Sequence, residues 1–123
     1  MDARSRIFLT VMVTATLFII GLIGAYTAAQ GADQVIRITA KKFVYTPREI
    51  TLKKGTPVVL EFTSEDILHG FNCPDLGIRS DILPGKITTL RFVPDKVGTF
   101  PFHCDNFCGS GHETMAGTII VRE

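Results

Sequence analysis

The stretch that decides the fold is GTFPFHCDNFCGSGHETMAGTIIVRE, residues 98–123. It begins with a strand-like run that ends near His103, and it closes with a second strand-like run, GTIIVRE. The segment between them, residues 102–117, holds two of the chain's three cysteines, two of its three histidines and one of its three methionines. Soft sulfur atoms and imidazoles in one loop between two strands indicate a metal site.

Strand-like alternation also continues upstream of this stretch. Alternating or apolar runs occupy residues 34–45, 48–64 and 85–92. A Lys-Lys-Gly turn signal divides the second run into two strands, and a Pro-Asp-Lys-Val-Gly turn signal follows the third. No amphipathic helix pattern follows residue 33. Short strands with turns about every ten residues predict an all-β sandwich, which we expect to be one domain at residues 32–123.

The first thirty residues differ in composition from the rest. After an early pair of arginines, no charged residue occurs until Asp33. A helix over residues 7–29 would be about 34 Å long, enough to cross a bilayer. A cleaved secretory signal is the alternative, although the apolar run of a signal usually ends at about 15 residues. We predict an uncleaved single-pass anchor at residues 1–31, with a cytoplasmic N-terminus in the cell membrane and an exported domain.

The balance of charge excludes a nucleic-acid partner. The chain has 13 Lys+Arg against 12 Asp+Glu, so it lacks the basic excess that binds a phosphate backbone. The cysteine count is more informative. Three cysteines in an oxidising compartment leave at least one unpaired, and metal ligation would protect such thiols from oxidation.

The donors of the loop are spaced Cys104-x-x-x-Cys108-x-x-x-His112-x-x-Met115. Thiolates and imidazoles suit copper, zinc or iron–sulfur, and a thioether favours copper. His69, at the end of an earlier strand run, could complete the site from the same end of a sandwich. Two alternatives stay open here. One is a simple disulfide between the two cysteines, and the other is a tetrahedral zinc site that leaves Met115 unused.

These residues resemble the CuA domain of cytochrome c oxidase subunit II, a member of the cupredoxin superfamily. That family has a Cys-x-x-x-Cys-x-x-x-His-x-x-Met loop, and this chain contains it in full. The block DILHGFNCPDLGIRSDILPG, residues 66–85, is similar to the family's segment around its first histidine ligand. The single predicted helix resembles the one-helix, B-family type of heme–copper oxidase. The resemblance covers roughly residues 34–123 and implies a cupredoxin-like Greek-key β-sandwich.

The resemblance also implies a binuclear copper site with two ions per chain. The implied ligands are His69, Cys104, Asn106, Cys108, His112 and Met115. The two thiolates would bridge both ions, and each histidine would bind one of them. The thioether and the backbone carbonyl of Asn106 would be weak axial ligands. The family often has Glu at the position of Asn106, where the carboxylate can hold a magnesium ion, so this chain departs from the pattern there.

The function implied by the resemblance is electron transfer. Protein would fill all ligand positions, so the chain would not be catalytic by itself. It would accept single electrons from a c-type cytochrome or another cupredoxin and pass them to subunit I of a membrane oxidase. One alternative is a free-standing exported cupredoxin that carries, stores or delivers copper. A fragment similar to the C-terminal domain of nitrous oxide reductase is a weaker one, because the chain has only three histidines.

Residues next to the ligands carry further expectations. Alternation along a strand places His69 and Cys73 on one face, so Cys73 is expected in the core below the metal. His103 precedes the first cysteine of the loop and should point away from the site. Three phenylalanines near the ligands are expected to pack around the site and keep it dry: Phe71, Phe102 and Phe107.

Overall fold

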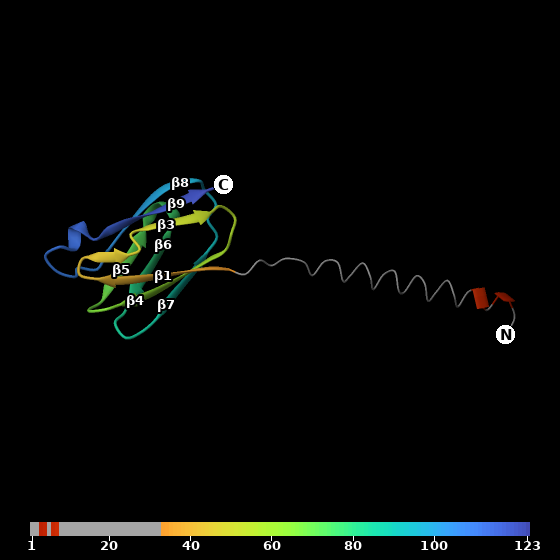
Figure 1. Cartoon of the computed structure of the whole chain (residues 1–123), viewed down its shortest axis with the longest axis horizontal. Coiled ribbons are helices and arrows are strands. Elements are labelled where there is room, and N and C mark those ends of the chain that lie inside the picture. Colours follow the sequence, from red (N-terminus) through yellow and green to blue (C-terminus); the bar gives the residue numbers. More distant parts are fainter. Residues whose placement is uncertain (1–2, 5, 8–32) are drawn as a thin grey trace. The chain divides into compact units, whose positions relative to one another are not determined.

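The described part of the chain after residue 32 is a sandwich of two β-sheets (Figure 1). The computed structural model describes residues 3–4, 6–7 and 33–123. Residues 3–4 and 6–7 are helical, and the rest of the predicted anchor at residues 1–31 lies outside the described residues. Within the described ranges, no helix has the length and apolar character needed to cross a membrane.

One sheet has four strands in the order β2-β1-β4-β7. Its strands are β1 (Gln34–Lys41), β2 (Val44–Thr46), β4 (Val58–Ser64) and β7 (Thr88–Phe92). β1 runs parallel to β4, whereas β2 and β7 are antiparallel to their neighbours. A turn at residues 42–43 divides the strand-like run 34–45 into β1 and β2, which pair with each other as a hairpin.

The second sheet has five strands in the order β3-β9-β8-β5-β6. Its strands are β3 (Glu49–Lys53), β5 (His69–Cys73), β6 (Ile78–Ile82), β8 (Gly98–His103) and β9 (Ala116–Arg122). β3 is parallel to β9, and the other neighbours are antiparallel. Two short 3-10 helices interrupt the connections, η1 (Pro74–Leu76) after β5 and η2 (His112–Thr114) before β9. The prediction of an all-β sandwich is confirmed.

An aromatic cluster fills the core between the sheets. Its four rings, all fully buried, belong to Tyr45, Phe62, Phe71 and Phe102. Neighbouring ring centroids are 4.7–6.3 Å apart in tilted or edge-on arrangements, which are favourable geometries for aromatic pairs. Phe71 follows His69 by two residues on β5, and Phe102 precedes Cys104 by two residues at the end of β8. The cluster therefore supports the two strand ends that carry candidate ligands.

Candidate metal centre

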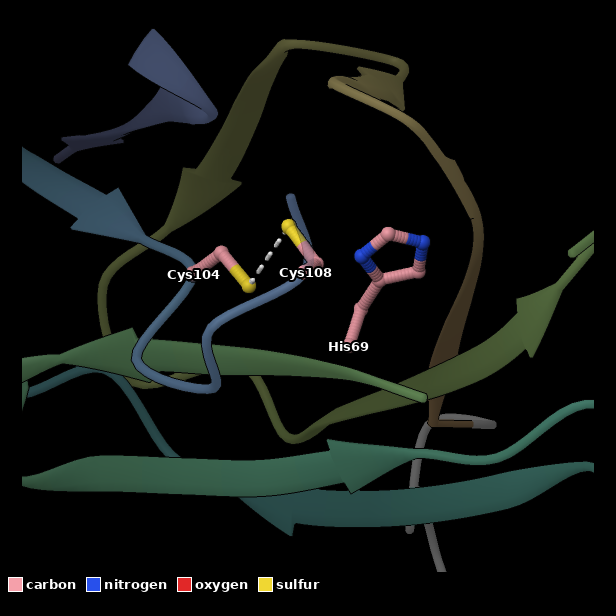
Figure 2. A group of neighbouring side chains, drawn as sticks. All are labelled: His69, Cys104 and Cys108. Atoms are coloured by element: carbon pink, nitrogen blue, oxygen red, sulfur yellow. Dashed lines mark hydrogen bonds between the residues drawn. The ribbon is translucent and has the colours of Figure 1, made fainter. Parts of the chain in front are cut away.

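The loop between β8 and β9 lies at the same end of the sandwich as the start of β5. Cys104 directly follows β8, and His69 is the first residue of β5. These strands are paired antiparallel, with Asn72 opposite His103. Figure 2 shows the side chains of Cys104 and Cys108 converging from the loop, with the His69 ring facing them. Strand pairing therefore joins a histidine to two cysteines that are distant in the sequence.

Three buried donors form the centre of this site. One ligand atom each from His69, Cys104 and Cys108 lies within 4.8 Å of the other two. These residues are 0%, 2% and 3% exposed, respectively. The two cysteine Sγ atoms are 3.8 Å apart, well beyond the S–S bond length of about 2.05 Å, and all three cysteines of the chain are free thiols. The disulfide alternative is not formed in this structure.

The other predicted ligands contact these cysteines. His112 Nδ1 lies 3.6 Å from Cys108 Sγ, and Met115 Sδ lies 3.8 Å from the same atom. The backbone oxygen of Asn106 lies 3.0 Å from Cys104 Sγ. Met115 is fully buried, so its thioether faces the site and not solvent. The structure thus brings together every residue that the sequence predicted as a ligand: His69, Cys104, Asn106, Cys108, His112 and Met115.

The protonation of His69 leaves one nitrogen ready for a metal. Its Nε2 lies 2.7 Å from Asp66 Oδ1, and a carboxylate can only accept, so Nε2 carries the proton. Its Nδ1 is buried and has no hydrogen-bond partner among residues 33–123. Figure 2 shows this nitrogen on the side of the ring that faces the two sulfur atoms. A buried acceptor without a partner is costly, and a bound cation would satisfy it.

Comparison with known proteins agrees with this arrangement. Residues 11–121 match the family described as the cupredoxin-like domain. The chain belongs to this cupredoxin-like family. The fold and the soft donor set together support copper binding by this cupredoxin.

Relatives of this cupredoxin include an oxidase subunit and a reductase. Over 88 residues the chain is 35% identical to cytochrome c oxidase subunit 2 of Thermus thermophilus, and this match covers 72% of the chain and 65% of the relative. The match to a second subunit 2 from the same species covers 52% of that relative. The chain therefore spans between half and two thirds of the length of these relatives. A 35% identical match to nitrous-oxide reductase of Ralstonia nicotianae covers 75% of this chain but only 15% of that protein.

A solved structure has the same fold. The periplasmic domain of subunit II of cytochrome oxidase from Bradyrhizobium japonicum superposes on this cupredoxin with a TM-score of 0.68. The match is 24% identical and covers 78% of this chain and 88% of that one. At this identity the likeness is one of fold.

Asp66 orients His69 from outside the donor set. Its carboxylate also accepts hydrogen bonds from the backbone N–H groups of Lys42, at 2.8 Å, and Ile67, at 2.7 Å. Burial raises the pKa of Asp66, but the bonds from Lys42, His69 and Ile67 outweigh it and lower the pKa to about 2. The group is therefore an ionised acceptor at neutral pH. The sequence analysis missed this role, although an acidic residue three positions before a candidate ligand was an available signal.

The metal-free site favours a protonated thiol at Cys108. Burial, followed by the hydrogen bond and charge of Cys104, raises the pKa of Cys108 to about 11. A cation reverses this preference, because metals bind the thiolate and displace the proton.

An ion-pair network fixes the loop against the β5–β6 hairpin. Arg79 on β6 binds Asp105 through two hydrogen bonds of 2.6 and 3.0 Å, and it pairs with Asp81 at 2.8 Å. The hydrogen bonds to Asp105 and then to Asp81 raise the pKa of Arg79. The side chain of Asn106 donates to Asp81 at 3.1 Å and to the His69 carbonyl at 3.4 Å. The loop is therefore held beside His69 by bonds that the sequence analysis did not anticipate.

Two neighbouring residues lie where strand alternation predicted. Cys73 is fully buried in the core on β5. His103 is exposed at the end of β8 and is not part of the donor cluster. Neither residue contributes a ligand atom to the cluster described here.

The expectation about the phenylalanines is partly wrong. Phe71 and Phe102 are fully buried beneath the site, as predicted. Phe107, in contrast, is 82% exposed. It directly precedes Cys108, whose side chain points inward, so its own ring is turned outward. The ring lies 5.6 Å from the His112 ring, centroid to centroid, on the solvent side of the loop.

Proposed function

We propose that this cupredoxin is a binuclear copper, or CuA, electron-transfer domain. One observation carries the proposal: Cys104 and Cys108 hold their sulfur atoms 3.8 Å apart in a buried cluster that also contains imidazole donors. Two adjacent thiols with two imidazoles close to them suit a pair of thiolate-bridged ions. A zinc site would leave the buried thioether of Met115 without a role, whereas copper accepts it.

The six donors would bind the ions in the roles that the resemblance implies. The two cysteines would bridge two ions, the two histidines would each bind one, and the thioether and the Asn106 carbonyl would be weak ligands. When bound, such a copper pair takes up and releases one electron with little change in its bonds. The protein holds the donor atoms in fixed orientations and excludes water from them. Asp66 fixes the ring of His69, and burial of both cysteines excludes water.

The similarity to oxidase subunit 2 supports a place for this domain beside a membrane heme–copper oxidase. In that setting residues 1–31 would be the membrane anchor and residues 32–123 the exported domain. The electron donor would be a c-type cytochrome or another cupredoxin. Phe107, exposed and in contact with the ring of His112, would give such a donor an apolar contact next to a ligand.

Copper analysis of the purified full chain tests the proposal. We expect two copper ions per wild-type chain and a visible spectrum dominated by sulfur-to-copper absorption. Cys104→Ser should lose both features, whereas the matched control Cys73→Ala should keep them, because Cys73 lies in the core outside the donor cluster. A single, readily chelated ion in the wild-type chain would contradict the proposal and favour copper storage or delivery instead.

A further inference from the structure

The backbone of Gly70 connects the metal centre to the core. Its N–H donates a hydrogen bond to Cys104 Sγ at 3.4 Å. Its carbonyl accepts a hydrogen bond from the Tyr45 hydroxyl at 2.5 Å. Both bonds are buried, and the next residue toward the N-terminus is the ligand His69. A single residue therefore joins a tyrosine on β2 to a thiol of the proposed copper site.

Residue 70 has no room for a side chain. A Cβ atom there would collide with a carboxylate oxygen of Asp105 and would lie 3.2 Å from the backbone nitrogen of Asn106. Glycine is the most flexible residue, so its own conformational preference does little to fix the direction of its N–H. Contacts from outside set that direction. One is the pairing of β5 with β6, in which Gly70 lies opposite Asp81, and the others are the Tyr45 hydroxyl on the carbonyl side and the loop carrying Asp105.

The packing of Tyr45 fixes the position of its hydroxyl, which donates a hydrogen bond. It is fully buried, and its ring packs edge-on against Phe71 and Phe102 with centroids 6.3 and 5.1 Å away. A backbone carbonyl oxygen can only accept, so the Tyr45 hydroxyl is the donor in its bond to Gly70.

We propose that Tyr45 is a positioning residue that, by holding the Gly70 carbonyl, keeps the Gly70 N–H aimed at the Cys104 sulfur. The effect of this hydrogen bond on the copper site rests on the proposed function. Hydrogen bonds to a cysteine sulfur tune the reduction potential of a copper–thiolate site. An N–H donor withdraws charge from the thiolate and favours the reduced site, so loosening it should lower the potential.

The test is Tyr45→Phe in the full chain, which removes only the hydroxyl. The matched control is Val58→Ala, a core truncation at the opposite end of β4 from the site. The first readout needs no metal: the hydrogen-exchange rate of the Gly70 amide, measured by NMR on the metal-free protein. The second is the reduction potential of the copper-loaded protein. We expect Tyr45→Phe to speed the exchange of the Gly70 amide about fivefold or more and to lower the reduction potential. Val58→Ala should not speed exchange at Gly70 more than elsewhere in the domain, and it should leave the reduction potential unchanged.

The two readouts separate the possible failures. Unchanged Gly70 exchange in Tyr45→Phe would overturn the positioning role, even if the chain binds no copper at all. Faster exchange throughout the domain, matched by Val58→Ala, would also overturn it, because that pattern reports general loss of stability. Faster exchange at Gly70 with an unchanged potential would contradict the tuning of the metal site. If the wild-type chain fails to take up copper, the proposed function fails, while the exchange result still decides what Tyr45 holds.

Discussion

Replacing Asp66 by Asn should disturb His69 without changing the shape of the side chain. The carboxylate accepts from Ile67 N–H and His69 Nε2 through Oδ1 and from Lys42 N–H through Oδ2. An amide offers one acceptor oxygen and one NH₂ donor, so it cannot face all three donors. If the NH₂ group of the new amide faces Lys42, it meets the backbone N–H of Lys42, which is also a donor. If the NH₂ group faces His69, the imidazole must accept at Nε2 and carry its proton on Nδ1, the atom that would bind metal.

The expected magnitude follows from the bonds that are lost. A hydrogen bond to a charged group contributes about 1.5–3 kcal/mol, and at least one is lost in either amide orientation. We expect the free energy of unfolding of the metal-free protein to fall by about 2 kcal/mol, which lowers the Tm by about 8–16 °C for a domain of this size. Loss of the outer partner of a metal-binding histidine typically weakens metal affinity about 10- to 100-fold, and we expect copper affinity to fall in that range.

Thermal unfolding of the metal-free protein and competition with a copper(I) chelator measure these two effects. Asp33→Asn is the matched control, because Asp33 is also an ion-paired carboxylate, bound to Arg91 at 2.7 Å, but lies at the start of the domain next to β1 and outside the site. The control should retain wild-type copper affinity. If Asp66→Asn also binds copper with wild-type affinity, the assignment of Nδ1 as the metal-binding nitrogen of His69 is wrong.

Three further predictions concern the same end of the sandwich. Gly70→Ala should destabilise the protein by about 1–3 kcal/mol in a denaturant titration, because the new Cβ displaces Asp105. The control is Gly55→Ala, whose Cβ meets open space, so this change should cost only the strain of a positive φ. Because the fold favours the neutral Cys108 thiol, the contribution of this group to the stability of the metal-free protein should be fully present below the ordinary pKa of 9.0 and should be lost as pH rises toward 11. Cys108→Ser should flatten this part of the stability profile, and a wild-type profile that is flat between pH 9 and 11 would contradict the prediction. Met115→Leu should keep both copper ions and the fold but shift the reduction potential, and an unchanged potential would mean that the thioether is only a core side chain.

The ligand loop could be predicted because its donors are close together in the sequence. The spacing of Cys104, Cys108, His112 and Met115 is visible without a structure, and the alternating runs on either side predict the strands that support it. His69 required one further inference, that two strand ends meet at one end of a sandwich, and the pairing of β5 with β8 brings it there.

The contacts that organise the site could not be predicted in the same way. The bond from Tyr45 to Gly70 and the pair between Arg79 and Asp105 join segments about 25 residues apart along the chain. They depend on the register of strands and on the path of a loop, which alternation does not specify. The prediction that Phe107 packs over the ligands was wrong for a related reason, because the path of the loop decides which of its side chains face solvent.

Copper stoichiometry combined with electron paramagnetic resonance tests the binuclear assignment most directly. The full chain is loaded with copper, freed of excess metal, and measured for copper per chain and for the hyperfine pattern of the oxidised form. We predict two ions per chain and the pattern of one unpaired electron shared equally by two copper nuclei. One ion per chain with the hyperfine pattern of a single copper nucleus would contradict the assignment of Cys104 and Cys108 as bridging ligands.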